Sequence, residues 1–134
     1  MKLITGTGLA MLVACAAAQS PNRDKSQAAE FKARSALAAK LREEFRSGLK
    51  DPESARFSSL VLSESETAEK TLALCGLVNA KNSYGGYTGN TGFVINTAGL
   101  VVIESSEPAG AFRSIWPVWC SRPLPADTSA KSAK

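Results

Sequence analysis

The apolar residues of this chain change their spacing once, near residue 50. Between residues 28 and 50 they recur at every fourth position, at Ala33, Leu37, Leu41 and Phe45, which is the period of one face of an amphipathic helix. Further along, short apolar segments alternate with turn residues, and no helical spacing separates them. Parallel strands need long crossover connections, usually helices. We therefore expect an α+β fold, in which an N-terminal amphipathic helix packs on a small antiparallel sheet of four or five strands.

Five segments have the composition of strands. Because Pro117 lacks an N–H, we expect the last of them at a sheet edge or beside a bulge. On a strand Trp116 and Trp119 would face opposite sides, with one of them available for contact; the favoured alternative is that both are partly buried. Ahead of the first strand, Asp51 and Pro52 predict a single helical turn, with Asp51 as its cap. The expected strands are Phe57–Ser63, Lys70–Ala80, 93–96, 100–104 and Arg113–Cys120.

The N-terminus has the features of an export signal. After Met1 and Lys2, residues 3–14 are mostly apolar; at about a dozen residues, the run is shorter than the ~20 needed to span a bilayer and fits a secretory signal peptide. It ends in Leu12-Val13-Ala14-Cys15. This motif resembles the bacterial lipobox. The resemblance implies that the signal peptide 1–14 is cut off and that Cys15 carries the acyl chains of a membrane anchor.

The lipobox resemblance divides the chain into four parts. After the lipoprotein signal peptide, we expect a lipidated tether (15–27), a single α+β domain (28–123) and a disordered tail (124–134). Ala16, rather than Asp, follows the cysteine, and by resemblance to sorting in enteric bacteria this favours the outer membrane, facing the periplasm, over the inner membrane. Two alternatives stay open: cleavage after Ala18, giving a free secreted protein, and an uncleaved helix with a buried cysteine.

Two further cysteines remain for the domain. With Cys15 lipidated, Cys75 and Cys120 form an even pair in an oxidising compartment, which predicts a disulfide bond between them. The alternative is two buried free thiols. A redox role is disfavoured because the chain has no C-x-x-C spacing.

The most unusual segment is the glycine- and tyrosine-rich loop 81–93. Its glycines allow backbone conformations closed to other residues, and its tyrosines offer flat amphipathic surfaces of the kind that binding loops use. No Gly-Lys-Ser/Thr follows, so it is not a phosphate-binding loop. The alternative is that the loop only connects two strands and that its tyrosines cover the edge of the core. The candidate binding residues are Lys81, Asn82, Tyr84, Gly85, Gly86, Tyr87 and Gly89.

Two pieces of the domain resemble a family of small exported proteobacterial proteins. They are residues 50–57, KDPESARF, and residues 75–89, CGLVNAKNSYGGYTG. The resemblance covers roughly residues 40–95. It implies an exported domain and no particular activity.

Composition excludes several function classes. The chain has no histidine, so Ser–His and Cys–His nucleophile pairs cannot form and the commonest metal ligand is missing. The net charge of +4 is spread along the chain without a basic block, which argues against nucleic-acid binding. We expect no metal, no cofactor and no enzymatic activity; for an enzyme, Glu104 and Glu107 would be the remaining candidate acid pair.

The sequence therefore predicts a non-enzymatic, membrane-anchored envelope lipoprotein that binds a protein partner through the Gly/Tyr-rich loop. Two alternative functions assume the same location in the cell envelope. One is a structural or assembly component of an envelope complex. The other is an inhibitor or immunity protein of a cell-wall hydrolase, with the loop plugging the enzyme cleft.

Overall fold

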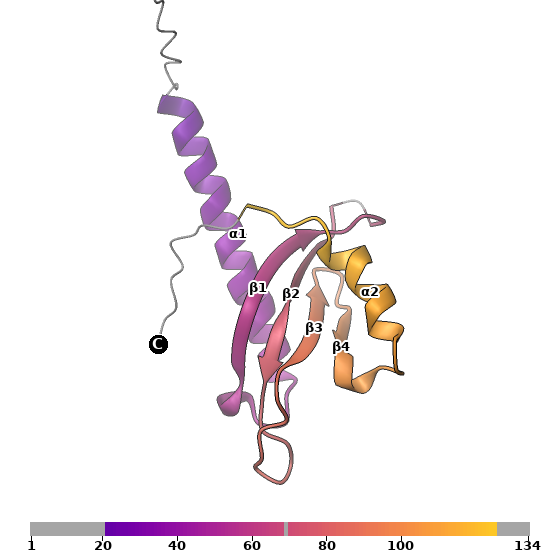
Figure 1. The fold of residues 1–134 in the computed structure, drawn as a ribbon. Coiled ribbons are helices and arrows are strands. Elements are labelled where there is room, and N and C mark those ends of the chain that lie inside the picture. Colours follow the sequence, from indigo (N-terminus) through magenta and orange to yellow (C-terminus); the bar gives the residue numbers. More distant parts are fainter. Residues whose placement is uncertain (1–20, 69, 126–134) are drawn as a thin grey trace, which may run out of the picture.

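The computed structural model describes residues 21–68 and 70–125. A long helix comes first, four strands follow, and a short helix ends the domain (Figure 1). The elements are α1 (Pro21–Ser47), η1 (Pro52–Ser54), β1 (Arg56–Glu64), β2 (Leu72–Asn79), β3 (Thr91–Asn96), β4 (Val101–Ile103), η2 (Glu104–Ser106) and α2 (Ala111–Cys120).

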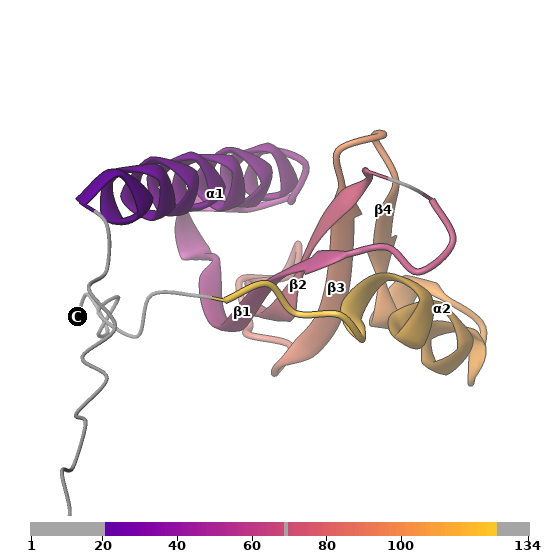
Figure 2. The same ribbon diagram turned by 90° about the horizontal axis from the view of Figure 1, so that it is seen from above.

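The strands form one antiparallel sheet in the order β1-β2-β3-β4, so each strand pairs with its neighbour in sequence. The two helices lie on opposite sides of this sheet (Figure 2). The predicted α+β class, with a helix ahead of a small antiparallel sheet, is confirmed. The turn expected at Asp51 is η1, and the Asp51 side chain caps it by accepting a hydrogen bond from the Ser54 N–H at 3.2 Å.

The face of the sheet under α1 is held together by aromatic packing. Phe45 of α1 lies against Phe93 of β3, with ring centroids 4.2 Å apart, and both rings meet Phe57 of β1 edge-on. Leu41, one turn before Phe45, is also buried against Leu74 and its neighbours in this cluster. The apolar stripe of the helix therefore packs as its spacing predicts, from Leu37 onward, whereas Ala33 is exposed.

The helix α1 begins earlier than predicted. Residues 21–27, expected as tether, form its first two turns. Pro21 suits the first helical position, where an N–H has no partner to lose, and residues such as Ala28 and Ala29 favour helix. The side chains of residues 25–30 are exposed, so this part carries no apolar stripe from which its start could be predicted. The helix also ends at Ser47, three residues before the predicted boundary.

The segment Arg113–Cys120 is a helix, and the strand predicted there is wrong. Its apolar residues lie at helical spacing and pack on the second face of the sheet, around Ala73 and Val94. Pro117 lies inside the helix rather than on an edge strand. Trp116 and Trp119 do not face opposite sides of a strand; both are half-buried and pack on this cluster, which confirms the alternative. The residues at helical spacing are Phe112, Ile115, Trp116, Trp119 and Cys120.

The chain after α2 runs back along the edge of β1. The N–H of Glu64 donates to the Arg122 carbonyl at 3.1 Å, and the N–H of Leu124 donates to the Leu62 carbonyl at 2.9 Å. The first residues of the predicted tail are thus paired with the sheet, which corrects its boundary at 124. The rest of that prediction, residues 126–134, lies outside the described residues, as do the predicted signal peptide and Cys15.

Candidate functional site

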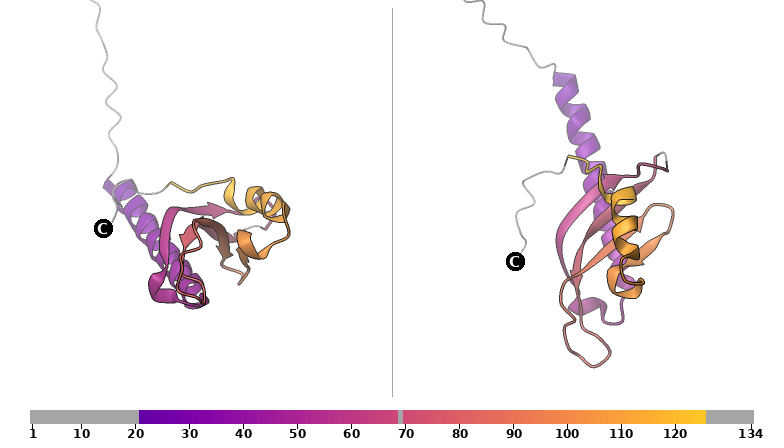
Figure 3. Two further views of the ribbon diagram at one scale, coloured as in Figure 1. Left: turned by 60° about the horizontal axis from the view of Figure 1, so that its bottom comes forward. Right: turned by 45° about the vertical axis from the view of Figure 1, so that its right-hand side comes forward.

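The Gly/Tyr-rich loop connects β2 to β3 and projects from one end of the sheet (Figure 1). Its predicted C-terminal bound at residue 93 is wrong, because residues 91–93 belong to β3, and the loop ends at residue 90. A single bridge between Lys81 and Tyr87 closes it at its base. Every residue from 82 to 90 is exposed. The view in the right panel of Figure 3 shows this loop and the first turns of α1 extending beyond opposite ends of the sheet. The loop is therefore a protrusion, and it lies far from the start of the helix.

Asn82 organises the tip of this loop. Its Oδ1 accepts hydrogen bonds from the N–H groups of Tyr84, at 2.9 Å, and Gly86, at 3.2 Å. Its backbone N–H donates to the Gly86 carbonyl at 2.9 Å, and its carbonyl accepts from the Gly85 N–H at 3.0 Å. An asparagine side chain that bonds to backbone groups nearby fixes a turn. Among the predicted binding residues, Asn82 and Gly86 thus shape the loop.

Two loop glycines are required by the backbone. Gly85 and Gly89 have φ of 80° and 90°, a region where a side chain is strained. The N–H of Gly89 also donates to the side chain of Asn79 at the end of β2, at 3.2 Å. These two glycines are therefore conformational rather than contact residues.

The two tyrosines have different environments. Tyr84 is 97% exposed at the tip of the loop, whereas Tyr87 is 42% exposed at its base. The Arg56 guanidinium lies 4.8 Å from the Tyr87 ring centroid, and the Lys81 ammonium lies 5.6 Å from it. Both distances are in the range of cation–π attraction. Tyr87 thus contacts two cations, and Tyr84 is the side chain that the loop presents.

The region around η1 supports the loop from the side. The Ser54 hydroxyl accepts a hydrogen bond from the Lys81 N–H at 2.9 Å, and the Lys50 ammonium donates to the Ser83 hydroxyl at 3.0 Å. Arg56 at the start of β1 adds its contact with Tyr87. The two separate sequence pieces singled out above, 50–57 and 75–89, therefore lie side by side. Lys50, Ser54 and Arg56 were absent from the predicted site because no local signal links them to a loop some thirty residues later.

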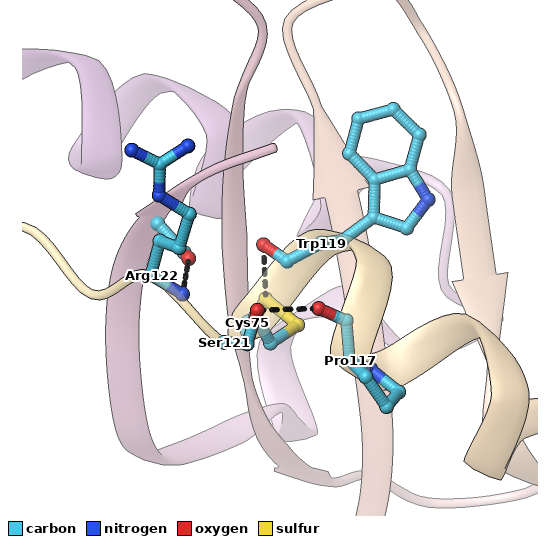
Figure 4. The surroundings of a disulfide bond; sticks show 7 residues. Cys75, Pro117, Trp119, Ser121 and Arg122 are labelled. Carbon is cyan, nitrogen blue, oxygen red and sulfur yellow. Dashed lines mark hydrogen bonds between the residues drawn. A yellow bond between two sulfur atoms is a disulfide. The ribbon is translucent and has the colours of Figure 1, made fainter. Parts of the chain in front are cut away.

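The predicted cysteine pair lies on the α2 face. The sulfur atoms of Cys75 on β2 and Cys120 at the end of α2 lie at disulfide-bonding distance, with their Cα atoms 6.1 Å apart (Figure 4). The Ser121 hydroxyl hydrogen-bonds the Pro117 carbonyl and the Glu66 carboxylate just beyond the bridge. This site fastens α2 to the sheet and offers no reactive thiol.

The candidate acid pair lies at the end of the sheet next to α2. Glu104 and Glu107 both border an open hollow of about 360 Å³ beside α2, but the Glu104 carboxylate accepts a hydrogen bond from the Gly92 N–H at 3.0 Å. Glu104 therefore fastens η2 to β3. Within residues 21–68 and 70–125, no group of His, Cys, Asp or Glu side chains is arranged to hold a metal ion.

A second concave surface lies between α1 and the sheet. This groove, of about 230 Å³, is mostly apolar. Its walls include Phe31 and Ala38 of α1, Leu60 and Leu62 of β1, and Leu124 of the C-terminal segment.

Comparison of the chain with protein-family models, with curated protein sequences and with solved structures gives no match. Among the described residues, no helix combines the length and the apolar character needed to cross a membrane.

Proposed function

We propose that this protein is a non-enzymatic envelope lipoprotein that presents a protein-binding loop at the end of the domain opposite its lipid anchor. The observation that carries the proposal is the preformed, solvent-exposed loop with Tyr84 at its tip. The predicted anchor at Cys15 precedes the first turn of α1 by only a few residues. The loop lies beside the other end of α1, where Lys50 contacts Ser83.

The helix α1 acts as the spacer between the anchor and the loop. Its 27 residues make a rod of about 40 Å at roughly 1.5 Å per residue. Its C-terminal end lies beside the loop, because Lys50, three residues after the helix, contacts Ser83. In the proposed arrangement, the anchor precedes the start of α1 and the loop lies about one helix length from that start. This arrangement favours contact with a partner in the space beyond the membrane.

The loop geometry also favours binding over a purely connecting role. A connection between adjacent antiparallel strands needs only two residues, whereas eleven residues separate β2 from β3 here. The Asn82 hydrogen bonds fix the longer connection before any partner arrives, which lowers the entropy cost of binding. A tyrosine exposed on such a fixed loop supplies contact area with few rotatable bonds.

Site-specific photocrosslinking in intact cells of the native host tests the loop. Replacing Tyr84 by the photoreactive p-benzoylphenylalanine should give one dominant protein adduct on irradiation. The same residue at Arg113, exposed on α2, is the matched control and should not give that adduct. If the two positions give indistinguishable adduct patterns, the loop has no specific protein partner and the proposal is wrong.

The anchor needs its own experiment. Metabolic labelling with a palmitate analogue should label the wild-type protein and not the Cys15→Ala variant, and mass spectrometry should find the mature chain starting at Cys15. An unmodified N-terminus in the native host would refute the lipid anchor while leaving the loop experiment to stand on its own.

A further inference from the structure

The loop is flanked by positive charge that no loop carboxylate offsets. Residues 81–90 contain no Asp or Glu. Lys81 belongs to the loop, and Arg56 and Lys50 reach it from β1 and from the end of α1 through their contacts with Tyr87 and Ser83. Three cations thus lie against the loop that carries Tyr84.

The nearest carboxylates of η1 are engaged elsewhere. Asp51 caps the 3-10 turn through the Ser54 N–H, and the Glu53 carboxylate lies 3.1 Å from a guanidinium nitrogen of Arg46. Neither forms an ion pair with the three cations around the loop within the described chain. Within segments 50–57 and 81–90, the three cations Lys50, Arg56 and Lys81 therefore outnumber Asp51, the one carboxylate there that is not paired with an arginine.

These cations are also partly ordered. Arg56 and Lys81 both lie over the Tyr87 ring, and the Lys50 ammonium is hydrogen-bonded. Long charged side chains on a free surface lose rotamer entropy when they bind. Side chains that are already held near one position lose less, so this arrangement suits recognition of negative charge beside the Tyr84 contact.

We propose that the partner is a protein with an acidic cleft, in which carboxylates flank an apolar hollow that receives Tyr84. The inference rests on the proposed function and specifies its partner. The protruding shape of the loop fits a concave surface, and its charge fits carboxylates. We disfavour an anionic membrane as the partner because the predicted anchor at Cys15 precedes the start of α1 in the sequence, whereas the loop lies beside the other end of this helix. Cell-wall hydrolases with paired active-site carboxylates belong to this class of cleft.

A charge-reversal variant tests the inference with the Tyr84 crosslinker in place. The triple variant Lys50→Glu, Arg56→Glu, Lys81→Glu should form the adduct at least ten times more slowly in envelope extract at low salt, because reversed charge removes electrostatic steering and adds repulsion. The matched control Lys32→Glu, Lys40→Glu, Arg113→Glu has the same net charge change at exposed sites elsewhere and should stay within twofold of wild type. Raising the salt concentration should slow adduct formation by the wild-type loop and reduce the difference in rate between the wild type and the charge-reversed loop variant.

The outcomes separate the two proposals. An adduct that forms equally fast in both triple variants overturns the acidic cleft and leaves the binding loop intact. Absence of any Tyr84 adduct in the wild type refutes both proposals. An adduct destroyed by nuclease, or one formed with anionic lipid, overturns the acidic cleft in favour of nucleic acid or membrane. Thermal unfolding of each variant verifies that the domain remains folded.

Discussion

The two faces of the sheet are covered by helices of very different kinds. On one face, the 27-residue α1 packs through the large side chains of Phe45, Phe57 and Phe93. On the other, the ten-residue α2 covers the smaller Ala73 and Val94 and is joined to the sheet through Cys120. The difference suggests that a long helix is held by burial, whereas a short helix that offers less apolar area needs a covalent link.

This comparison also concerns the proposed function. On the α1 side of the sheet, Lys50, three residues after α1, contacts the loop through Ser83. The α2 face contributes no contact to the loop in the hydrogen bonds and ring contacts described above. Damage to the two faces should therefore have different consequences for the domain and for partner binding.

The largest effect is expected from Phe93→Ala on the α1 face. Phe93 is completely buried between two other phenylalanines, and such truncations lower the free energy of unfolding by about 3–5 kcal/mol. Phe112→Ala on the α2 face should lower the free energy of unfolding by less, because this side chain is 8% exposed and has one aromatic neighbour. Urea unfolding of both variants measures the difference, and a larger loss for Phe112→Ala would contradict the comparison.

Removing the cysteine pair is expected to have the next largest effect. The bridge spans 45 residues, for which the chain-entropy model predicts a loss of about 4 kcal/mol. Chemical denaturation of the Cys75→Ala, Cys120→Ala variant measures this loss. Hydrogen exchange should show α2 losing protection at conditions where the buried turns of α1 keep theirs. Equal loss of protection in both helices would show that the faces are not independently held.

Two glycines allow a smaller and more direct comparison of the faces. A methyl group at Gly76 would lie 2.7 Å from Leu60, 3.1 Å from the Ser58 carbonyl oxygen and 3.2 Å from the buried Phe93 ring. A methyl group at Gly92 would lie 2.6 Å from the Phe112 ring. Overpacking typically costs about 1–3 kcal/mol.

The loss of stability caused by Gly76→Ala should fall at the upper end of the range for overpacking, because a backbone carbonyl and a fully enclosed ring cannot move aside easily. Gly92→Ala should fall at the lower end, because Phe112 belongs to a short helix that can shift by a few tenths of an ångström. Thermal unfolding of the two alanine variants, with the disulfide intact in both, decides the order. A larger loss of stability for Gly92→Ala than for Gly76→Ala would mean that the α2 face of the sheet is packed more rigidly than the α1 face.

The sequence predicted one face much better than the other. Leu37, Leu41 and Phe45 recur at every fourth position, and a helix is the structure that buries all three side chains on one face. In α2, tryptophan, isoleucine and Pro117 favour a strand by composition, and the correct signal was the helical spacing of Phe112, Ile115 and Trp116. That spacing is visible in the sequence and should outweigh residue type, because packing overrides propensity.

For the candidate site, the loop and its glycines were predictable from composition and the cations were not. Gly85 and Gly89 occupy the positive-φ positions that such a segment predicts. Arg56 and Lys50 reach the loop because η1 returns the chain beside β2, and that contact exists only in three dimensions. Nothing in the spacing of residues 50–57 alone identifies which of them face residues 81–90.

The smallest effect is expected from Pro117→Ala, which tests whether α2 is intrinsically weak. Pro117 lies inside α2 and is exposed, so alanine can supply the missing N–H without disturbing the core, and the Arg113 carbonyl one turn earlier would accept it. Proline also restricts the unfolded chain, which offsets part of the gain. We expect a net stabilisation of roughly 1 kcal/mol, measured by thermal unfolding.

The stabilisation by Pro117→Ala should be larger in the protein without its cysteine pair, because there α2 depends on its own helical stability. A gain that is identical with and without the bridge would show that the covalent link and the helix contribute independently.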